Sequence, residues 1–213
     1  MFHRTIVTLF VCLGVLLAAS SPGWAGKFNR KLNVGDAAPT FEKLPGIDGK
    51  MHSLDLYKDS KAVVIVFLCN HCPVAVAYEQ RLIDFALEYQ ETKGVAVIAV
   101  SVSHRPEDAL GKMKEHAVAK KFPFTYIHDA SQDIGRNYGA TATPHVFVLD
   151  KARKVAYMGA FDDSINPGKV ETHYVRDAVE AILAGKQPEI GESRQIGCAI
   201  EYEKKKAAEK KSE

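Results

Sequence analysis

The chain has 213 residues, of which 46% are hydrophobic and 25% charged, which is the balance of a globular protein and excludes a disordered or collagen-like one. Its formal net charge of +2 gives no electrostatic reason to expect nucleic acid as a partner. A chain of this length buries enough apolar surface to fold as one domain unaided, so its four cysteines are too few to form a scaffold.

The N-terminal segment has the pattern of a secretory signal peptide. Basic side chains precede an apolar run over residues 6–19, and residues 23–25 place small side chains where a signal peptidase reads them. The run is shorter than the about 20 residues that a membrane-spanning helix needs. The alternative to a cleaved signal peptide is an uncleaved anchor. We therefore expect residues 1–25 to be removed, with Cys12, and the protein to be secreted, most simply into a bacterial periplasm, with no membrane span left. The remaining cysteines are Cys69, Cys72 and Cys198.

Two extended segments open the expected mature domain. Residues 41–47 and 51–56 flank Asp48-Gly49, a dipeptide suited to a tight turn, which predicts an N-terminal β-hairpin. Residues 62–68 and 95–102 are nearly continuous apolar, β-branched runs. Such runs are typical of central strands that are buried on both faces of a sheet.

An amphipathic helix connects the two predicted central strands. Apolar side chains between residues 74 and 89 recur at spacings of three and four, and Glu79 falls with other charged residues on the opposite, solvent-facing side. Gly94 ends this helix. A second helix is expected over residues 106–120, because Pro is well suited to a first helical turn.

The second half of the chain continues the alternation. Residues 124–128 predict a short strand, residues 146–149 and 154–158 an antiparallel pair, and residues 170–183 a helix. The elements together predict an α/β fold with a central mixed β-sheet flanked by helices.

The C-terminal region divides near residue 200. Residues 201–213 are almost all charged or Ala, too poor in apolar side chains to offset the entropy of ordering. We expect a disordered tail after a domain of residues 26–200. Cys198 is expected in a loop or a short final strand, as either an inert thiol or a third redox thiol that resolves or shelters an active pair.

The chemistry centres on Cys69-Asn70-His71-Cys72-Pro73, where a predicted strand ends and the amphipathic helix begins. A helix N-terminus presents unpaired N–H groups and the positive end of the macrodipole, which lowers the pKa of a nearby thiol. Cys69 is the expected nucleophile and the more accessible thiol, and Cys72 is placed to attack a mixed disulfide from inside. A redox pair is favoured over a zinc site, which needs more ligands at matching spacing, and over an inert disulfide.

Further motifs carry a family resemblance. Residues 34–39 (VGDAAP) are similar to the opening of redoxins, and Thr143-Pro144 resembles a cis-proline signature. With the two-cysteine motif, the sequence resembles the thioredoxin superfamily, and more narrowly the secreted TlpA/ResA-like thiol-disulfide oxidoreductases and the AhpC/TSA family. The resemblance implies a thioredoxin-like fold in which Thr143, Pro144 and His145 form the surface where a substrate polypeptide or thiol docks.

His71 and two missing side chains bear on the mechanism. Protein disulfide isomerases resemble this chain in having His before the second cysteine. There a protonated imidazole favours the thiolate and makes the disulfide more oxidising. The alternative is that His71 is a solvated histidine in a turn. Peroxidases of the AhpC/TSA family have Thr or Ser three residues before the nucleophile, and Val66 stands there instead, which disfavours their mechanism. The buried acid of thioredoxins is replaced by Val63.

We therefore predict a secreted, monomeric thiol-disulfide oxidoreductase that exchanges disulfides with protein thiols and an unidentified redox partner through Cys69 and Cys72, with His71 assisting. No cofactor or bound metal is implied. The alternatives are a peroxide-reducing redoxin and, less favoured, a metallochaperone that holds copper or zinc with both cysteines and a histidine. The direction of electron flow is open, because potentials of this fold range from about −270 to about −120 mV.

Overall fold

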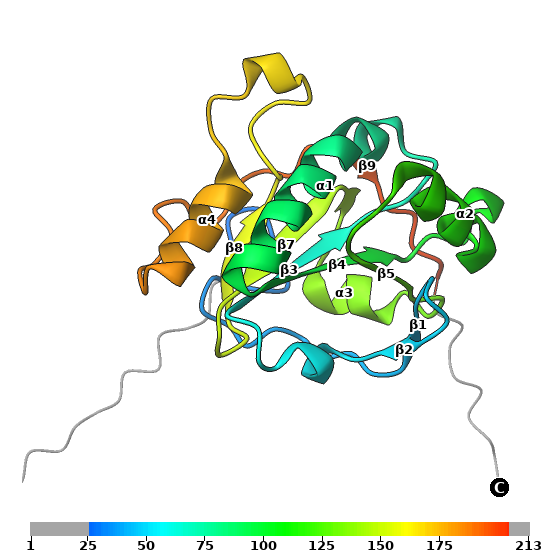
Figure 1. Cartoon of the computed structure of the whole chain (residues 1–213), viewed down its shortest axis with the longest axis horizontal. Coiled ribbons are helices and arrows are strands. Elements are labelled where there is room, and N and C mark those ends of the chain that lie inside the picture. Colours follow the sequence, from blue (N-terminus) through cyan, green and yellow to red (C-terminus); the bar gives the residue numbers. More distant parts are fainter. Residues whose placement is uncertain (1–25, 205–213) are drawn as a thin grey trace, which may run out of the picture.

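A five-stranded mixed sheet forms the centre of the computed structural model, which describes residues 26–204 (Figure 1). The predicted signal peptide, Cys12 and most of the predicted tail lie outside these residues. The strand order is β5-β4-β3-β7-β8. The strands are β3 (Ala62–Phe67), β4 (Val95–Ser101), β5 (Thr125–His128), β7 (His145–Leu149) and β8 (Val155–Gly159).

Strand direction follows the connections. β3, β4 and β5 run parallel, whereas β7 pairs antiparallel with both β3 and β8. Every residue of β3 and β4 is buried, which confirms the prediction of central strands made from their apolar runs. The carboxyl ends of these two neighbouring parallel strands therefore meet at one edge of the sheet, and the loops that leave them lie side by side.

Helices cover both faces of the sheet. One apolar core holds side chains of α1, α2 and α4, and the other holds side chains of α3 and of the segment before β3. Figure 1 shows α1 lying across the sheet, with α4 beside it. The helices are α1 (Pro73–Lys93), α2 (Leu110–Lys120), α3 (Asp133–Tyr138) and α4 (Tyr174–Leu183). No helix within residues 26–204 combines the length and the apolar composition needed to cross a membrane.

The N-terminal hairpin is present but shorter than predicted. β1 (Leu44–Pro45) and β2 (Met51–His52) pair antiparallel around a turn in which Gly49 has a φ of 78°. The extended segment predicted to reach residue 56 instead forms a 3₁₀ helix over Leu54–Tyr57. This turn buries Leu54 against the sheet, and that tertiary contact outweighs the local strand pattern.

α1 begins and ends where the sequence predicts, but one of its faces was misassigned. It starts at Pro73 and stops at Gly94, which has a left-handed backbone. Glu79 was expected to face solvent, yet it is only 3% exposed, because α2 packs over that side. Its carboxylate lies 2.5 Å from His116 Nε2 and 2.9 Å from Lys120 Nζ. The charged residues on one side of a helix therefore do not show whether that side faces solvent or a neighbouring helix with basic side chains.

Other element boundaries differ for local reasons. Pro106 starts a 3₁₀ helix over Pro106–Asp108, and α2 itself begins only at Leu110. α3 is not among the predicted helices, because its six residues are too few to show a helical period. α4 begins four residues later than predicted, after an isolated turn over Pro167–Lys169. The first turn over Pro106–Asp108 matters most, because it places Asp108 at the site described below.

The segment after α4 returns to the sheet edge. β9 (Cys198–Ala199) pairs antiparallel with β6 (Ala142–Thr143), so of the two alternatives expected for Cys198, a loop or a short final strand, the structure has the strand. Part of the expected tail is packed as well, because the Tyr202 hydroxyl donates a hydrogen bond to Ala140 O (2.7 Å) and Arg136 lies over the Tyr202 ring. The ordered chain thus reaches beyond residue 200.

Arg81 neutralises the carboxylate of Asp162, which is 1% exposed, and its side chain is anchored by two further hydrogen bonds to the carbonyls of Ser164 and Ile165. We expect Arg81→Ala to lower the free energy of unfolding in urea by about 3 kcal/mol, because it leaves a buried charge without a cation. Arg176 provides the control, because its ion pair with Glu88 lies at the surface, with side chains that are 42% (Arg176) and 43% (Glu88) exposed. Arg176→Ala should cost less than about 1 kcal/mol, and equal losses in the two variants would contradict this account.

Candidate functional site

Three cysteines meet beyond the carboxyl end of β3. Cys69 is the free cysteine of the described residues, and its Sγ lies 3.2 Å from Thr143 Oγ1. Cys72 forms a disulfide with Cys198, from which it is separated by 126 residues in sequence. The two-cysteine motif predicts a disulfide between Cys69 and Cys72. In this structure the motif instead holds one thiol and one half of a disulfide that joins α1 to β9.

The N-terminus of α1 is directed at Cys72. Cys72 is the N-cap residue, and Ala75 N donates a hydrogen bond to its sulfur (3.3 Å). Burial raises the pKa of the Cys69 thiol, and the nearby Asp108 carboxylate raises it further, against the opposing effects of the Thr143 hydrogen bond and the backbone N–H of Cys72 at the helix N-cap. The expectation of a lowered pKa for Cys69 is therefore wrong in its net direction, because burial outweighs the N–H group at the helix N-terminus. The surroundings of Cys69 therefore disfavour its thiolate.

Access to the sulfurs is unequal. Cys69 is 3% exposed and Cys72 is fully buried, whereas Cys198 is partly exposed. Cys69 lines a cavity of about 380 Å³, whereas neither Cys72 nor Cys198 does. Besides Cys69, side chains that border this cavity include His71, Arg105, Thr143, Ile200 and Tyr202. A substrate in the cavity thus meets Cys69 first, which agrees with the relative accessibility expected for the two motif cysteines.

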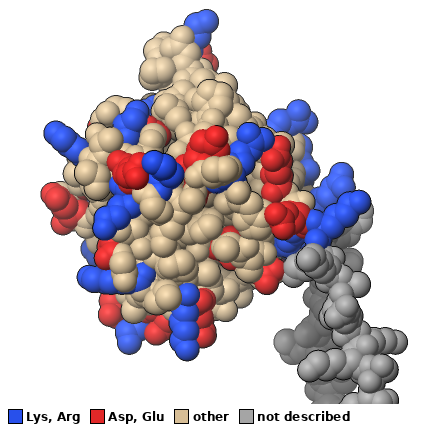
Figure 2. All heavy atoms as spheres, turned by 90° about the vertical axis from the view of Figure 1, so that its right-hand side faces the viewer, with Lys and Arg blue, Asp and Glu red and all other residues tan. Residues whose placement is uncertain are grey.

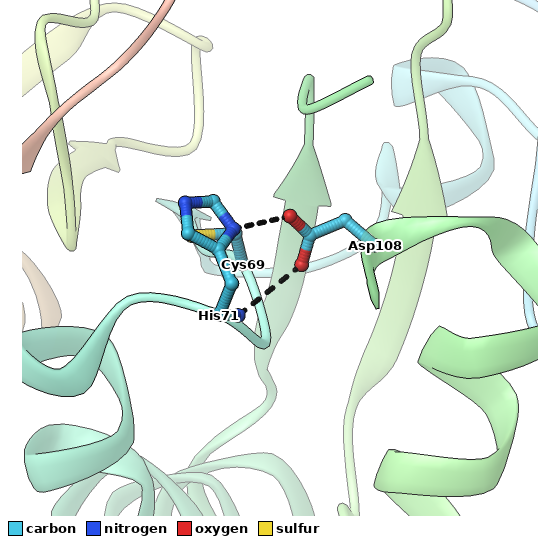
Figure 3. Close-up of side chains that lie close together, drawn as sticks. All are labelled: Cys69, His71 and Asp108. Carbon is cyan, nitrogen blue, oxygen red and sulfur yellow. Dashed lines mark hydrogen bonds and ion pairs between the residues drawn. The ribbon is translucent and has the colours of Figure 1, made fainter. Parts of the chain in front are cut away.

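Asp108 fixes the orientation of His71. Figure 3 shows its carboxylate facing both the ring and the backbone N–H of His71. One carboxylate oxygen pairs with His71 Nδ1, and the other accepts a hydrogen bond from Asn70 N at 2.6 Å. The opposite ring nitrogen, Nε2, lies 4.0 Å from Cys69 Sγ. Because Asp108 is completely buried and accepts from Nδ1–H, it favours the tautomer whose Nε2 lone pair is available to the thiol.

Asp108 is not among the site residues predicted from the sequence. It lies 37 residues after His71, in the loop that follows β4, and no local motif connects the two positions. The sequence did contain an indication of this contact. β3 and β4 are parallel neighbours, so acidic residues that follow β4 come close to the loop that follows β3. The 3₁₀ turn that aims this carboxylate, rather than the adjacent Glu107, inward was not readable from the pattern.

Cys69, His71 and Asp108 also offer ligand atoms within 4.8 Å of one another. The carboxylate oxygens of Asp108 are already engaged by Asn70 and His71. Asp108 therefore serves to orient His71 rather than to bind a metal ion. The remaining ligands would be the Cys69 thiolate and the His71 imidazole. That set falls short of the three or four protein ligands of zinc sites.

The Thr143-Pro144 peptide bond is cis, as predicted. Thr143 faces Cys69, but Pro144 is buried, and β9 covers the strand that carries Thr143. The two segments touch closely, because a Cβ atom at Gly197 would lie 2.4 Å from Thr143 O. His145 was expected at a docking surface, yet it is 3% exposed and packs against Phe147. Of these expected docking residues, only Thr143 borders the cavity.

His145 makes the stability of the fold depend on pH. Burial lowers the pKa of His145 to about 4, and its Nδ1 accepts a hydrogen bond from Thr141 N. In the unfolded chain the pKa is about 6.5, so protons bind preferentially to the unfolded state between these values. The stabilisation is complete above about pH 6.5 and falls by about 1.4 kcal/mol per pH unit toward pH 4. Urea unfolding of His145→Gln should show a shallower pH dependence; the same slope as in the parent protein would contradict this assignment.

Charge is mixed over the exposed surface. On the face drawn in Figure 2, Lys and Arg side chains alternate with Asp and Glu. Near the cavity, Arg105 pairs with Glu201 and His104 with Glu203. Near the cavity, each of these cationic side chains therefore lies beside a carboxylate.

Comparisons with known proteins bear on this site. The model of the AhpC/TSA family matches residues 34–158. The chain is similar to a solved structure of a hypothetical protein from Sinorhizobium meliloti, with 34% identity, a TM-score of 0.74, and coverage of 81% of this chain and 96% of that one. An uncharacterized conserved protein from Geobacillus kaustophilus is 31% identical, with a TM-score of 0.77 and coverage of 84% and 96%.

A third solved structure is that of a putative thiol:disulfide interchange protein DsbE from Chlorobium tepidum. It is 25% identical, with a TM-score of 0.59 and coverage of 71% of this chain and 99% of that one. None of the curated proteins compared matches the chain. The fold is thioredoxin-like, as the resemblance implied.

Proposed function

Because this chain belongs to the AhpC/TSA family, we propose that it is a thiol-disulfide oxidoreductase that exchanges disulfides with partner proteins at Cys69. The observation that carries the proposal is a free thiol on the wall of a cavity, with a histidine and a buried carboxylate aligned behind it. Secretion into an oxidising compartment is part of the proposal, because residues 1–25 have the pattern of a signal peptide and disulfides persist there.

The first step activates Cys69. His71 Nε2 accepts the thiol proton, and Asp108 stabilises the resulting imidazolium through Nδ1–H. Thr143 Oγ1 donates a hydrogen bond to the thiolate. This arrangement opposes the effect of burial, which raises the pKa of the thiol. Here Asp108 is a positioning residue, and Cys69 is the nucleophile.

The exchange then follows from the two motif cysteines. In the reduced protein, the Cys69 thiolate attacks one sulfur of the partner disulfide, and the other partner sulfur leaves as a thiolate that takes up the proton held by His71. Cys72 next attacks Cys69 Sγ, which forms the Cys69–Cys72 disulfide and releases the second partner thiol. The partner gains two electrons and the protein dithiol loses two. The reverse sequence oxidises a partner dithiol.

Peroxide reduction at Cys69 is the second candidate. Val66 disfavours it in the sequence, because the residue three positions before Cys69 has no hydroxyl. The structure supplies a hydroxyl from elsewhere, since Thr143 Oγ1 lies 3.2 Å from Cys69 Sγ. In this reaction the thiolate attacks a peroxide oxygen, releases the alcohol or water and becomes a sulfenic acid, which a second thiol reduces.

Three assays on the purified protein distinguish these functions. We expect the protein to accelerate the reduction of insulin by dithiothreitol, to consume hydrogen peroxide only at the rate of free cysteine, and to contain no stoichiometric copper or zinc. Catalytic peroxide consumption without insulin reduction would replace the proposal with the second candidate. One equivalent of metal that is lost in Cys69→Ser would support a metallochaperone instead.

Replacing Cys72 should trap partners. In Cys72→Ser the mixed disulfide at Cys69 has lost its resolving thiol, so adducts should accumulate when the variant is expressed in its native compartment. Non-reducing gels followed by peptide mapping should place the adducts on Cys69. The matched control is Cys69→Ser/Cys72→Ser, which keeps Cys198 as its free thiol. Adducts of equal abundance in this control would mean that Cys198, not Cys69, reacts with partners.

A further inference from the structure

Cys198 is held at the site by contacts that do not depend on its disulfide. The β6–β9 pairing places Cys198 opposite Thr143, and Ile200 N donates to Thr141 O at 3.0 Å. Further along, the Tyr202 hydroxyl bonds to Ala140 O. Because these contacts are backbone pairings or lie outside the disulfide, reduction of Cys198 leaves its thiol beside Cys72.

The three sulfurs gather around one residue. Cys69 Sγ lies 3.2 Å from Thr143 Oγ1, Cys72 Sγ lies 3.2 Å from Thr143 O, and Cys198 is the strand partner of Thr143. Cys72 is common to both possible pairs, because it is bonded to Cys198 here and belongs with Cys69 to the two-cysteine motif. Only Cys69 borders the cavity, so oxidation that begins at Cys69 has to pass through Cys72 to reach Cys198.

We propose that Cys198 is a third redox-active thiol and that the Cys72–Cys198 disulfide forms by migration of a disulfide first made between Cys69 and Cys72. The proposal rests on the proposed function and deepens it. In the migration step the Cys198 thiolate attacks Cys72 Sγ, so the Cys72–Cys198 bond forms and the Cys69–Cys72 bond breaks. Cys69 leaves as a thiolate and takes up the proton that Cys198 gave up. The step changes no oxidation state and needs no further reactant.

The migration has a chemical consequence at the cavity. It moves the disulfide behind the cavity wall, where Cys72 is fully buried, and returns Cys69 as a free thiol facing the cavity. The oxidised protein therefore keeps its nucleophile and forms a mixed disulfide with a second partner. A protein with only the motif pair has no free thiol after one oxidation.

Time-resolved disulfide mapping tests the migration. The fully reduced protein is mixed with one equivalent of diamide, quenched in acid at intervals, alkylated and digested for mass spectrometry. We expect the Cys69–Cys72 disulfide to appear first and to decay as Cys72–Cys198 rises. In Cys198→Ser the Cys69–Cys72 disulfide should persist, and in Cys69→Ser formation of Cys72–Cys198 should slow by about tenfold or more, because the thiol that lines the cavity is gone.

Two results would overturn the migration. One is formation of Cys72–Cys198 in Cys69→Ser at the rate of the parent protein, and the other is a Cys69–Cys72 disulfide that persists in the parent protein as long as it does in Cys198→Ser. Both leave the proposed function standing, provided that Cys198→Ser still reduces insulin. If Cys198→Ser neither forms Cys69–Cys72 nor reduces insulin, the proposed function fails together with the migration.

Discussion

Cys69→Ser is expected to reduce insulin no faster than dithiothreitol alone, while keeping its fold and its Cys72–Cys198 disulfide. The reason is that Cys69 is the free thiol of the described residues and the cysteine that borders the cavity, and a serine hydroxyl does not attack a disulfide. Turbidity of precipitating insulin measures the rate, and thermal unfolding followed by circular dichroism measures the fold.

Cys198→Ser provides the control for the first result. It also removes one sulfur from the site, but it leaves both motif cysteines, so it should retain insulin reduction. If Cys69→Ser were as active as the parent protein, the catalytic thiol would have to be Cys72 or Cys198, released from their disulfide by the reductant in the assay.

Asp108→Asn is expected to slow alkylation of Cys69 by iodoacetamide at pH 7 by about 10²-fold, the size of a lost general base. An amide at this position offers its NH₂ group to His71 Nδ1, which moves the ring proton to Nε2 and removes the lone pair that faces Cys69. Mass spectrometry of the labelled peptide against time measures the rate, and a pH series places the change in the titration of the thiol.

The sign of the effect decides between two roles for Asp108. As a nearby negative charge alone, it raises the pKa of Cys69, so its removal would lower that pKa and speed the alkylation. If Asp108 instead orients His71 and stabilises its imidazolium, removal of the carboxylate slows the alkylation. Glu107→Gln is the matched control, since it removes a carboxylate from the neighbouring, exposed position and should change little. Faster labelling of Asp108→Asn would contradict the orienting role.

The sequence predicted those parts of the fold that depend on local patterns. The apolar, β-branched runs of β3 and β4 require cover on both faces, and this alone places them at the centre of the sheet. The motif at the junction of β3 and α1 combines a strand end with a Pro that starts a helix, so the position of the site was readable as well.

What the sequence did not reveal depends on segments far apart in the chain. The Cys72–Cys198 pairing arises because β9 returns to β6, and its two residues carry no strand period to detect. The partner of Glu79 comes from α2, and the partner of His71 from the turn before α2. The helix N-terminus was located correctly, but the sequence did not show that Cys72 accepts the N–H group of Ala75 or that burial outweighs the N–H group of Cys72 at Cys69.

A single-turnover reaction between the reduced protein and a peptide disulfide tests the central claim most directly. The mixture is quenched in acid within milliseconds to seconds, and the attachment site of the peptide is mapped by mass spectrometry. We predict that the first adduct is a mixed disulfide at Cys69, which decays as a Cys72 disulfide forms and the peptide is released as a dithiol. Peptide attached first to Cys72 or Cys198, or reduced with no adduct at Cys69 in either the parent protein or Cys72→Ser, would contradict the account.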